Sequence, residues 1–576
     1  MNKYYRIVAW LIVLVMGVVL VACGATEAPA PTEAPAATEA AQEATEAPAP
    51  TETPEPEEAE PVILRVGILA DVDCWNPYAC ASVWFQGHIL LEGFTDHGPA
   101  STGCEAIPRL ADSWEVSEDG RTWTIKLHEG ITFSDGSPAD AQAIVDFITW
   151  QWNSPEMQVW FAELVAMESI EALDDLTIQY TTSDPILNSP DYDWQWWYIL
   201  PPDYWTGLSD EEIYLVEYNP PIGTGPYVLT EHEPGNYMIL DAREDYYRGK
   251  PPIDRVVLQI FGNADALVSA LVAGEIDMTT PWLPPEVYDT LANASDVTVE
   301  TKPPGRWSEL VFNMHPDGIK HPAIDDPQVR EAIDYAIDKE QLIEIALLGQ
   351  GITCPTNWGC GPNFEGEMNP DLVVTPFDLE MANQILDEAG YADSDGDGIR
   401  ETPDGEPLIF RLTYQVETAT DLTMAELMAS TLREAGIELE IEGQEWGTWF
   451  STVLDARDFD LAIDTETHDI DPASMDFWFS CWSADSGSAA LNYPGWCNEE
   501  VDGLVYEFWY STDPEGRWEP MFKAQEILNQ QRPIINLAGH YSIQAYRSDR
   551  FEFPTDTCDV DFGMFSSVGL LNAIVK

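Results

Sequence analysis

An acidic loop with the sequence DSDGDGIRETPD has the residue types and the spacing of a calcium site. Asp393, Asp395 and Asp397 occupy its first, third and fifth positions, and Asp404 occupies the twelfth. Calcium binds about six to eight oxygen ligands, and a glycine at the sixth position permits the tight turn among them. The backbone carbonyl of Ile399 would add a further ligand. The loop therefore predicts a structural calcium ion, bound with modest affinity.

Two departures from the calcium-binding pattern keep a second interpretation open. Arg400 stands at the eighth position instead of an apolar residue, and Asp404 is shorter than the usual glutamate. An acidic surface loop without a metal would have the same composition. The loop follows a predicted helix that begins at Asp378, so we expect it to fasten structure and not to perform catalysis.

The motifs of common catalytic centres are missing from the sequence. It contains no HExxH, GxSxG, GxxxxGKS/T or GxGxxG segment, which would serve a zinc protease, a serine hydrolase, a nucleotide phosphate or a dinucleotide. Paired carboxylates can be imagined among 102 acidic residues, so a surface-anchored glycoside hydrolase stays an alternative. We expect a binding protein that is not an enzyme and has no catalytic cofactor.

The charge of the chain limits its partners. Lys and Arg number 25 against 102 Asp and Glu, which gives a formal net charge of −77. Nucleic acid is not an expected partner, because phosphate binding needs clustered Lys and Arg. The acidic residues spread along the whole chain, which indicates solubility through mutual repulsion; a preference for cationic ligands is the alternative.

The first 22 residues have the features of a secretory signal peptide. Lys3 and Arg6 precede an apolar stretch of 15 residues, Ile7 to Val21, which is short for a membrane-spanning helix. The stretch ends in LVAC at Cys23, which resembles a bacterial lipobox, and in such lipoproteins the cysteine is lipidated and becomes the mature N-terminus. An ordinary signal peptide with an incidental cysteine is the alternative.

The composition of residues 23–61 predicts a tether. They repeat T-E-A-P with variations and contain no aromatic residue, so they cannot bury enough surface to offset chain entropy, and we expect them to be disordered. Together with Cys23 they predict an extracytoplasmic protein that a lipid anchors to the cell membrane, in the periplasm or on the outer face of the cytoplasmic membrane.

The other eight cysteines are an even number in an exported chain, which favours disulfides. Eight cysteines allow many connectivities, so any pairing from spacing alone is a guess. A zinc site is the competing interpretation, although no CxxC pair is present and the eight histidines are scattered. Short spacings suggest Cys74 with Cys80, Cys354 with Cys360, and Cys481 with Cys497, which would leave Cys104 and Cys558.

Strand and helix patterns alternate through residues 62–576, a length that suits two or three domains. Buried or half-buried strands are predicted for residues 62–69 and 123–127. Helices are predicted with Ser137 as N-cap, with Asp378 as N-cap and Gly390 at the end, and over residues 422–435. The pattern predicts a mixed α/β architecture.

Several segments of this body stand out as sequence blocks. They are ADSWEVSEDGRTWTIKLHEGITFSDGSPADAQA from Ala111, GTGPY from Gly223, REDYYRGKPPIDRVVL from Arg243, ALVAGEIDM from Ala270, LVFNM and DDPQVREAIDYAIDKEQL between Leu310 and Leu342, and LDEAGY from Leu386. In this order they resemble the blocks of the family 5 extracellular solute-binding proteins, the oligopeptide and dipeptide receptors of ABC importers. The ordered set is more specific than any single block, and it covers essentially the whole folded body.

The resemblance implies an α/β, two-lobed, periplasmic-binding-protein-like fold of class II, cluster C, with an extra subdomain in the first lobe. Lobe I would span residues 62–305, with the extra subdomain at about 96–205. Lobe II would span residues 306–530, and residues 531–576 would return to lobe I.

The resemblance also implies where a ligand sits. In peptide receptors of this family a cleft aspartate pairs with the α-amine of the peptide, and the matching stretch here is DLAIDTETHDIDP, from Asp460. It is about one residue shorter than the usual pattern, which leaves peptide specificity open. Asp469 is the predicted amine partner and Asp471 the second candidate, beside Thr467 and His468. A mere capping role for Asp469 is the alternative.

Four tryptophans are candidates for stacking on a ligand, namely Trp75 after the first strand, and Trp282, Trp446 and Trp449 beyond strand or turn positions. A buried tryptophan is more often part of a core, but aromatic platforms suit both peptide side chains and sugar rings. We therefore expect a monomeric receptor that captures a peptide or similar small solute and delivers it to the permease subunits of an ABC importer. An oligosaccharide receptor of the same family is the alternative.

Overall fold

The computed structural model describes residues 60–576 apart from 73, 81–87, 100, 102–103, 159–160, 188, 357–365, 468–473, 485–490, 514–515, 557 and 559–562. Internal contacts divide the chain into residues 1–61 and 62–576. The predicted signal peptide, Cys23 and nearly all of the tether lie outside the described residues. Within the described part, no helix combines the length and apolar character that a membrane crossing needs.

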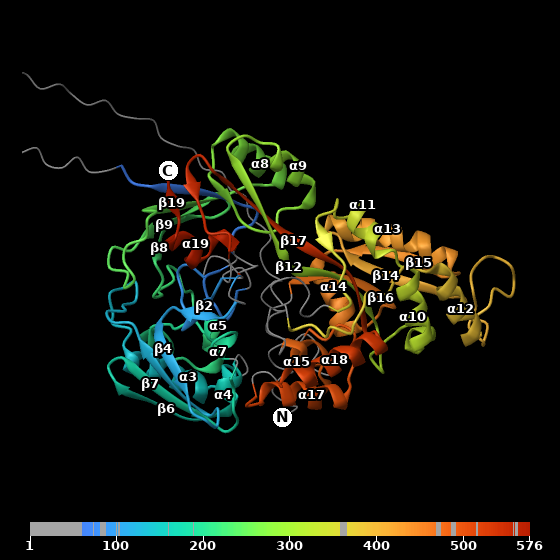
Figure 1. Cartoon of the computed structure of the whole chain (residues 1–576), viewed down its shortest axis with the longest axis horizontal. Helices are drawn as coiled ribbons and strands as arrows, with labels where there is room; N and C mark the ends of the chain where they lie inside the picture. The colour runs from blue at the N-terminus through green and yellow to red at the C-terminus, as the bar shows by residue number, and fades with distance from the viewer. Residues whose placement is uncertain are drawn as a thin grey trace, which may run out of the picture. The chain divides into compact units, whose positions relative to one another are not determined.

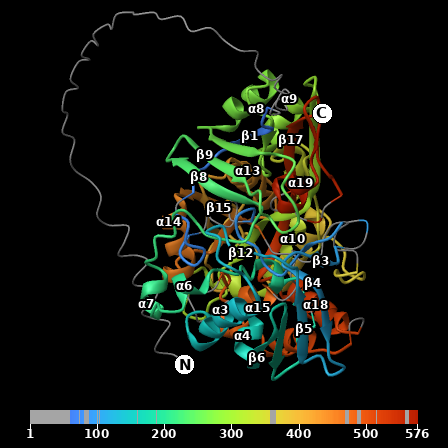
Figure 2. The same cartoon turned by 90° about the vertical axis from the view of Figure 1, so that its left-hand side faces the viewer.

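One large mixed sheet runs through residues 62–576 and contains eleven strands of the described chain. Figure 1 shows its strands, and Figure 2 shows the β8–β9 edge. In spatial order the strands are β15 (Glu438–Gln444), β14 (Ile409–Gln415), β16 (Leu461–Thr467), β12 (Val297–Phe312), β17 (Ile534–Arg547), β11 (Met278–Thr279), β1 (Ile63–Ile68), β10 (Arg255–Ile260), β9 (Tyr237–Ala242) and β8 (Tyr227–Glu233), and β13 (Gly351–Ile352) pairs with β17 beside this path.

The strands β12 and β17 form the centre of this sheet. They pair antiparallel from Val297 opposite Arg547 to Val311 opposite Ile534, with register shifts after Lys302 and after Ser308. Beyond β12 lies the parallel pair β14–β15 with β16, and beyond β17 lie β11, β1 and β10. The lobe boundary predicted at residue 305 falls inside β12, so the two central strands belong to both halves of the sheet.

A separate four-stranded antiparallel sheet lies within residues 111–182. Its order is β4 (Ala111–Val116), β5 (Thr122–Leu127), β7 (Thr177–Thr182) and β6 (Met167–Asp174), and α3 (Ala141–Asn153) contacts β6 and β7. The predicted start of α3 was wrong: Asp140 is the N-cap and accepts a hydrogen bond from the Ala143 N–H. Pro138 instead bridges to Thr132, because the turn at Ser137 closes a small hairpin before the helix begins.

The remaining helices cover the sheets. They are α4 (Ala162–Ala166), α5 (Asp193–Trp196), α6 (Pro202–Trp205), α7 (Asp210–Ile213), α8 (Ala264–Ala273), α9 (Tyr288–Ala292), α10 (Pro327–Ala336), α11 (Lys339–Ile345), α12 (Leu379–Ala389), α13 (Ala419–Glu434), α14 (Trp446–Phe450), α15 (Ser474–Phe479), α16 (Cys481–Ala484), α17 (Glu499–Trp509), α18 (Trp518–Gln531) and α19 (Ser567–Leu571).

Short elements complete the structure. They are the strand pairs β2 (Thr95–His97) with β3 (Ala106–Pro108) and β18 (Phe551–Glu552) with β19 (Ile574–Val575), the single turns η3 (Pro285–Val287), η4 (Pro322–Asp325) and η8 (Gly563–Phe565), and the π-helical segment η6 (Ser451–Ala456).

The apolar cores lie on different parts of the large sheet. One cluster joins β1 and β10, through Leu64 and Leu258, to the four-stranded sheet. A second packs α10 and α13 on β12 and β16, through Leu310 and Ile463, and a third packs α14, α17 and α18 on the other face. The result is the predicted mixed α/β architecture, with separate cores on either side of the central strands.

Candidate functional site

A cavity of about 490 Å³ lies where the central strands meet segments from both halves of the large sheet. This volume falls within the usual range of small-molecule sites, about 300–1,000 Å³. The lining residues from the β11 side are Trp282, Leu283, Pro284, Pro285 and Glu286; those from the β14–β16 side are Leu347, Gln350, Gln415, Glu417, Thr418, Ala419, Thr420, Trp446 and Thr465; and the central strands supply Arg306, His540, Tyr541 and Ile543.

Two of the four predicted tryptophans line this cavity from opposite sides. Trp446 opens α14, leaves 49% of its surface exposed and lies 5.2 Å, centroid to centroid, from the Phe450 ring. Trp282 has a φ of 65°, a conformation that is unusual for a bulky residue. The next residue, Leu283, donates its N–H to the carbonyl of Ile543 on β17, over 3.2 Å, which anchors this segment beside the central strand.

The other two tryptophans, Trp75 and Trp449, are core residues and do not line this cavity. Trp75 is 3% exposed and packs edge-on against His232, and Trp449 is fully buried with its ring 5.3 Å from that of Tyr493. The Trp449 ring does not reach the cavity because it lies on the inward face of α14, three residues after the exposed Trp446. At both positions the free energy gained by burying the large apolar ring favours a place in the core.

A chain of hydrogen bonds lies behind the wall formed by β12, β16 and β17. The Thr465 hydroxyl donates to Asp421 Oδ1 over 2.9 Å, and Ser308 Oγ lies 2.8 Å from Thr465 Oγ1. Ser308 Oγ also lies 2.7 Å from His540 Nε2. Arg306 donates from Nη2 to the Thr465 carbonyl over 3.2 Å. Arg306, Ser308, Thr465 and His540 share one face of the sheet, because Ser308 faces Thr465 and Arg306 faces His540 across the register, and Asp421 reaches this face from α13.

Two groups in this chain of hydrogen bonds have pKa values far from their usual range. Burial raises the pKa of Asp421 to about 7, although the Thr465 hydrogen bond and the Arg306 cation act in the opposite direction. Burial lowers the pKa of His540 to about 3, and the neighbouring Arg306 cation adds to this effect. The imidazole is therefore neutral throughout the physiological range.

This arrangement differs from a serine hydrolase site. In a catalytic triad a carboxylate pairs with His Nδ1 and the serine faces the substrate. Here Asp421 connects to His540 only through Thr465 and Ser308, on the Nε2 side of the ring. Ser308 is fully buried, so its hydroxyl does not reach a solute in the cavity.

The rest of the lining can recognise polar groups. Glu286 and Glu417 add carboxylates, and Gln415 donates from Nε2 to Asp464 Oδ1 over 3.2 Å. The Thr420 hydroxyl is buried and has no hydrogen-bond partner within the described chain. Aromatic rings, charges of both signs and unsatisfied polar atoms together suit a polar solute with apolar faces.

The predicted amine partners cannot be placed. His468, Asp469 and Asp471 lie outside the described residues. Thr467 ends β16, where its backbone pairs with that of Arg306.

Sequence analysis missed several residues of the cavity. Arg306 and His540 lie 234 positions apart and become neighbours only through the pairing of β12 with β17. The one relevant expectation was the lobe boundary between residues 305 and 306, because the resemblance implies that a ligand is enclosed between the lobes.

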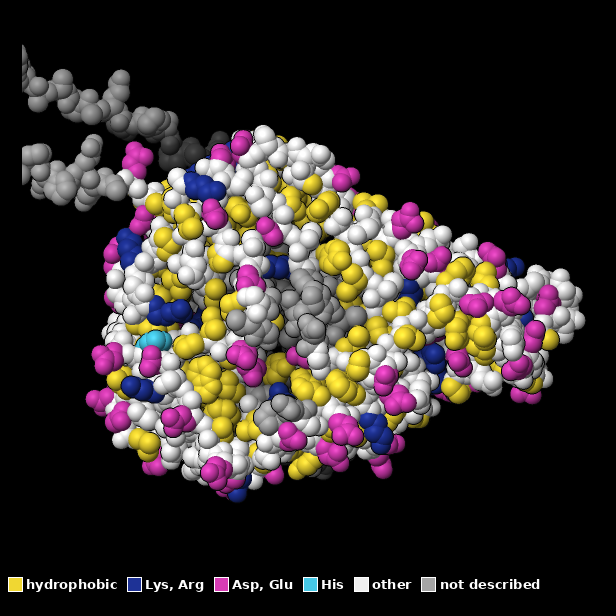
Figure 3. Space-filling view, in the orientation of Figure 1, with side chains coloured by type: hydrophobic (Ala, Val, Ile, Leu, Met, Phe, Trp, Pro, Cys, Tyr) yellow, Lys and Arg dark blue, Asp and Glu magenta, His cyan; other side chains and the backbone are white. Residues whose placement is uncertain are grey.

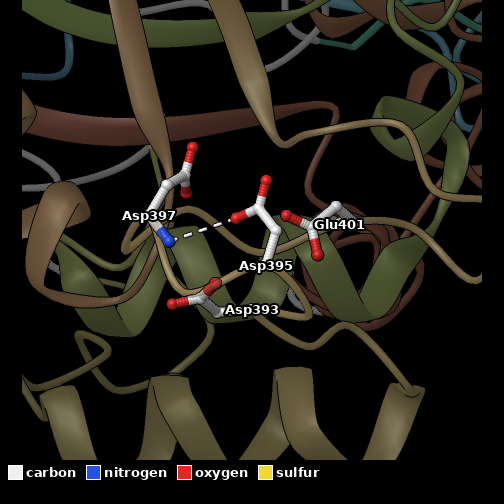
Figure 4. A group of neighbouring side chains, drawn as sticks. All are labelled: Asp393, Asp395, Asp397 and Glu401. Atoms are coloured by element: carbon white, nitrogen blue, oxygen red, sulfur yellow. Dashed lines mark hydrogen bonds between the residues drawn. The ribbon is translucent and has the colours of Figure 1, made fainter.

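The acidic loop gathers four carboxylates whose oxygens lie within 4.8 Å of one another, from Asp393, Asp395, Asp397 and Glu401. Figure 4 shows the four side chains around one space. Asp393 accepts N–H hydrogen bonds from Gly396 and Gly398, which hold the loop in a tight turn.

Asp404, the predicted twelfth-position ligand, does not belong to this group of neighbouring carboxylates. Glu401 takes its place because it forms a β-bridge with Ala392 and thereby returns to the start of the loop. Asp404 lies beyond, in a turn that the Gly405 N–H closes on the Thr402 carbonyl over 2.8 Å. Ile399, whose carbonyl was a predicted ligand, is buried and donates its N–H to Asp397.

Disulfides join three of the suggested cysteine pairs. They are Cys74 with Cys80, Cys104 with Cys558, and Cys481 with Cys497. Cys354 is also disulfide-bonded, whereas Cys360 lies outside the described residues.

The charged side chains on the surface agree with the acidic composition of the sequence. Figure 3 shows acidic side chains spread over one face of the molecule, with fewer Lys and Arg among them. No single basic patch stands out on this face.

Comparisons with known proteins agree with this fold. The family model for bacterial extracellular solute-binding proteins, family 5 (middle), matches residues 105–488. The dipeptide-binding protein of Escherichia coli is 25% identical over 477 residues, which are 77% of this chain and 83% of that protein. The nickel-binding periplasmic protein of the same organism is 26% identical over 357 residues, which are 61% of this chain and 66% of that protein.

A solved structure has the same fold. The periplasmic oligopeptide-binding protein of Thermotoga maritima matches with a TM-score of 0.79 and 20% identity, over 90% of this chain and 100% of that chain. The same protein with mannohexaose bound gives 0.74 and 22% identity over the same shares. The fold is thus the two-lobed α/β fold of periplasmic binding proteins. Because the family model covers well over half of the chain, this chain belongs to the bacterial extracellular solute-binding proteins of family 5.

Proposed function

We propose that this protein is the extracytoplasmic receptor of an ABC importer and captures a short peptide, or a similar small solute, in the cavity between its lobes. The observation that carries the proposal is the lining of that cavity, to which segments beside β11 and segments beside β14 and β16 both contribute. A solute in contact with both walls favours the conformation in which they approach, so binding shifts the population toward closure. A permease that recognises the closed form then receives only loaded receptor.

Peptide is the first candidate because dipeptide- and oligopeptide-binding relatives share the family. An oligosaccharide is the second candidate, and one observation favours it: Trp446 presents an exposed ring to the cavity, with Trp282 on the other side. Aromatic rings stack on sugar faces, and one relative has been solved with mannohexaose bound.

The test is a direct binding measurement. Native mass spectrometry of protein purified from its own cells identifies a retained solute, and calorimetry then measures binding of trialanine and of mannohexaose to stripped protein. We expect saturable binding of one of the two, at one site, without any product. Cleavage of either probe, or no binding of either, would contradict the proposal.

We further propose that the loop of Asp393, Asp395, Asp397 and Glu401 holds a structural calcium ion. The support is chemical: four carboxylates within 4.8 Å offer the hard oxygen ligands that calcium prefers, and a cation would offset their mutual repulsion. The ion would fasten the loop that follows α12.

We also propose that Cys23 carries a lipid anchor and that the receptor acts as a monomer outside the cytoplasm. The support lies in the sequence, namely the basic start, the apolar stretch and the LVAC segment followed by a chain without apolar clusters. Growth with a radiolabelled fatty acid tests the anchor: we expect label in the wild-type protein and none in Cys23→Ser.

A further inference from the structure

The hydrogen bonds behind the cavity form one continuous chain, and the proton count of its members fixes its direction. Above a pH of about 7, where Asp421 is ionised, its carboxylate only accepts, so the Thr465 hydroxyl donates its single proton to Asp421 Oδ1. The 2.8 Å bond between Thr465 and Ser308 then has Ser308 as the donor. Since Ser308 has no second proton, the 2.7 Å bond to His540 has the ring Nε2–H as the donor.

This direction sets the tautomer of His540. The ring is neutral beside Arg306, so it carries one N–H, and a proton on Nε2 leaves Nδ1 as a bare acceptor. His540 lines the cavity, and its Nδ1 makes no hydrogen bond to any residue that the structure describes. Asp421, which does not line the cavity, therefore determines whether the His540 imidazole offers the cavity a hydrogen-bond acceptor or a donor.

We propose that Asp421 acts through Thr465 and Ser308 as a positioning residue that makes His540 Nδ1 a hydrogen-bond acceptor for the solute. The solute group at this point is a neutral donor, an amide N–H or a hydroxyl, because the cation of Arg306 beside the ring repels an ammonium group. This inference rests on the proposed function, since it places the solute in this cavity.

Other charged groups near this wall do not interrupt the chain. Glu417 lies in the turn before α13, where its carboxylate accepts the Trp446 N–H over 3.1 Å. Asp464 points to the opposite face of β16, where Gln415 donates to it. Among the described residues, Arg306 is the cation that acts on both Asp421 and His540.

The tautomer is measurable without any solute, by heteronuclear NMR of protein labelled in its histidine nitrogens. A His540→Gln variant assigns the signal, and the work is done at pH 9, where Asp421 is ionised. We expect wild-type His540 to carry its proton on Nε2. The variant Thr465→Val keeps the shape of the side chain but interrupts the series of hydrogen bonds. We expect His540 to populate the Nδ1–H form in this variant.

Thr413→Val is the matched control. Thr413 is buried on neighbouring β14, its hydroxyl has no partner among the described residues, and its register with Ala462 puts it on the opposite face from Thr465. We expect this variant to leave the His540 tautomer unchanged. An Nδ1–H tautomer in the wild-type protein at pH 9, or the same tautomer ratio in Thr465→Val as in Thr413→Val, would overturn the proposal.

A pair of small probes tests the donor preference. Acetamide carries N–H donors, and N,N-dimethylacetamide has the same carbonyl without them. We expect acetamide to shift the His540 Nδ1 signal more than its dimethylated analogue does, and equal shifts would overturn the inference. Both measurements omit the natural solute, so they are separate from a failure of trialanine and mannohexaose to bind, which would overturn the proposed function alone.

Discussion

Trp446 and Trp449 share the short helix α14, yet the first is 49% exposed at the cavity and the second is fully buried. A Trp446→Ala change should therefore weaken binding of whichever probe binds, trialanine or mannohexaose, by about fivefold, since an aromatic contact contributes about 1 kcal/mol beyond its buried area. The unfolding midpoint in urea should change little. Calorimetry and urea unfolding measure the two effects.

Trp449→Ala is the matched control for that prediction. Removing a fully buried tryptophan should lower the free energy of unfolding by about 3–5 kcal/mol. If Trp449→Ala weakened binding at unchanged stability while Trp446→Ala did not, the assignment of the two rings would be reversed.

Asp421 makes the stability of the protein depend on pH. Its pKa is about 7 in the folded protein against 3.8 in the reference state, so between these values the unfolded chain releases a proton that the folded chain keeps. Stability from this group is therefore lost as the pH rises from about 4 to about 7, and the loss is constant above that range. We expect Asp421→Asn to be more stable than wild type by about 1–3 kcal/mol at pH 9.

The same comparison at pH 4 provides the control, because the folded carboxyl is then neutral and the unfolded one is only partly ionised, so most of the cost of keeping it neutral in the fold is absent. The advantage of Asp421→Asn should shrink or reverse there, as the variant changes only the hydrogen bond from Thr465. Urea unfolding at the two pH values measures this. A difference between variant and wild type that is the same at pH 4 and pH 9 would show that Asp421 does not titrate in this way.

Elements with local start and stop signals follow from the sequence. Asp378 caps α12 and Gly390 ends it with a φ of 88°, as their positions predict. The start of α3 moved to Asp140 because Ser137 and Pro138 serve the preceding hairpin. The pairing of β12 with β17 carries no local signal, since the two strands lie more than 200 positions apart, and so most of the cavity could not be predicted from the sequence.

The acidic loop is an element whose stability should depend on calcium. We expect calcium to raise the melting temperature by about 1–3 °C and a chelator to reverse this, because an ion that binds only the folded loop stabilises it. Asp393→Asn should abolish the response. Asp404→Asn, outside the carboxylate group, should retain it. A melting temperature that no chelator moves, measured by calorimetry, would exclude the site.

The disulfide between Cys104 and Cys558 ties the end of the chain to an early segment, across a separation of 454 residues. Replacing both cysteines by serine should lower the free energy of unfolding by about 2–5 kcal/mol, since the bond restricts a long loop in the unfolded chain. The pair Cys74 and Cys80 closes only six residues, so the same replacement there should cost less. Equal losses of unfolding free energy in the two double variants would argue against loop restriction as the cause.

At the scale of the whole molecule, the large sheet connects two halves through β12 and β17, and the cavity lies beside these strands. The family blocks identified the fold because they mark turns and core positions along the entire body. They carry no information on the solute, since the lining of the cavity comes from residues outside most of these blocks.

Small-angle scattering of stripped receptor, before and after the solute released from natively purified protein is added back, tests the central claim most directly. Capture between two lobes predicts a smaller radius of gyration at saturation and recovery of the solute chemically unchanged. An unchanged radius of gyration at saturation, or recovery of a cleaved product, would contradict it.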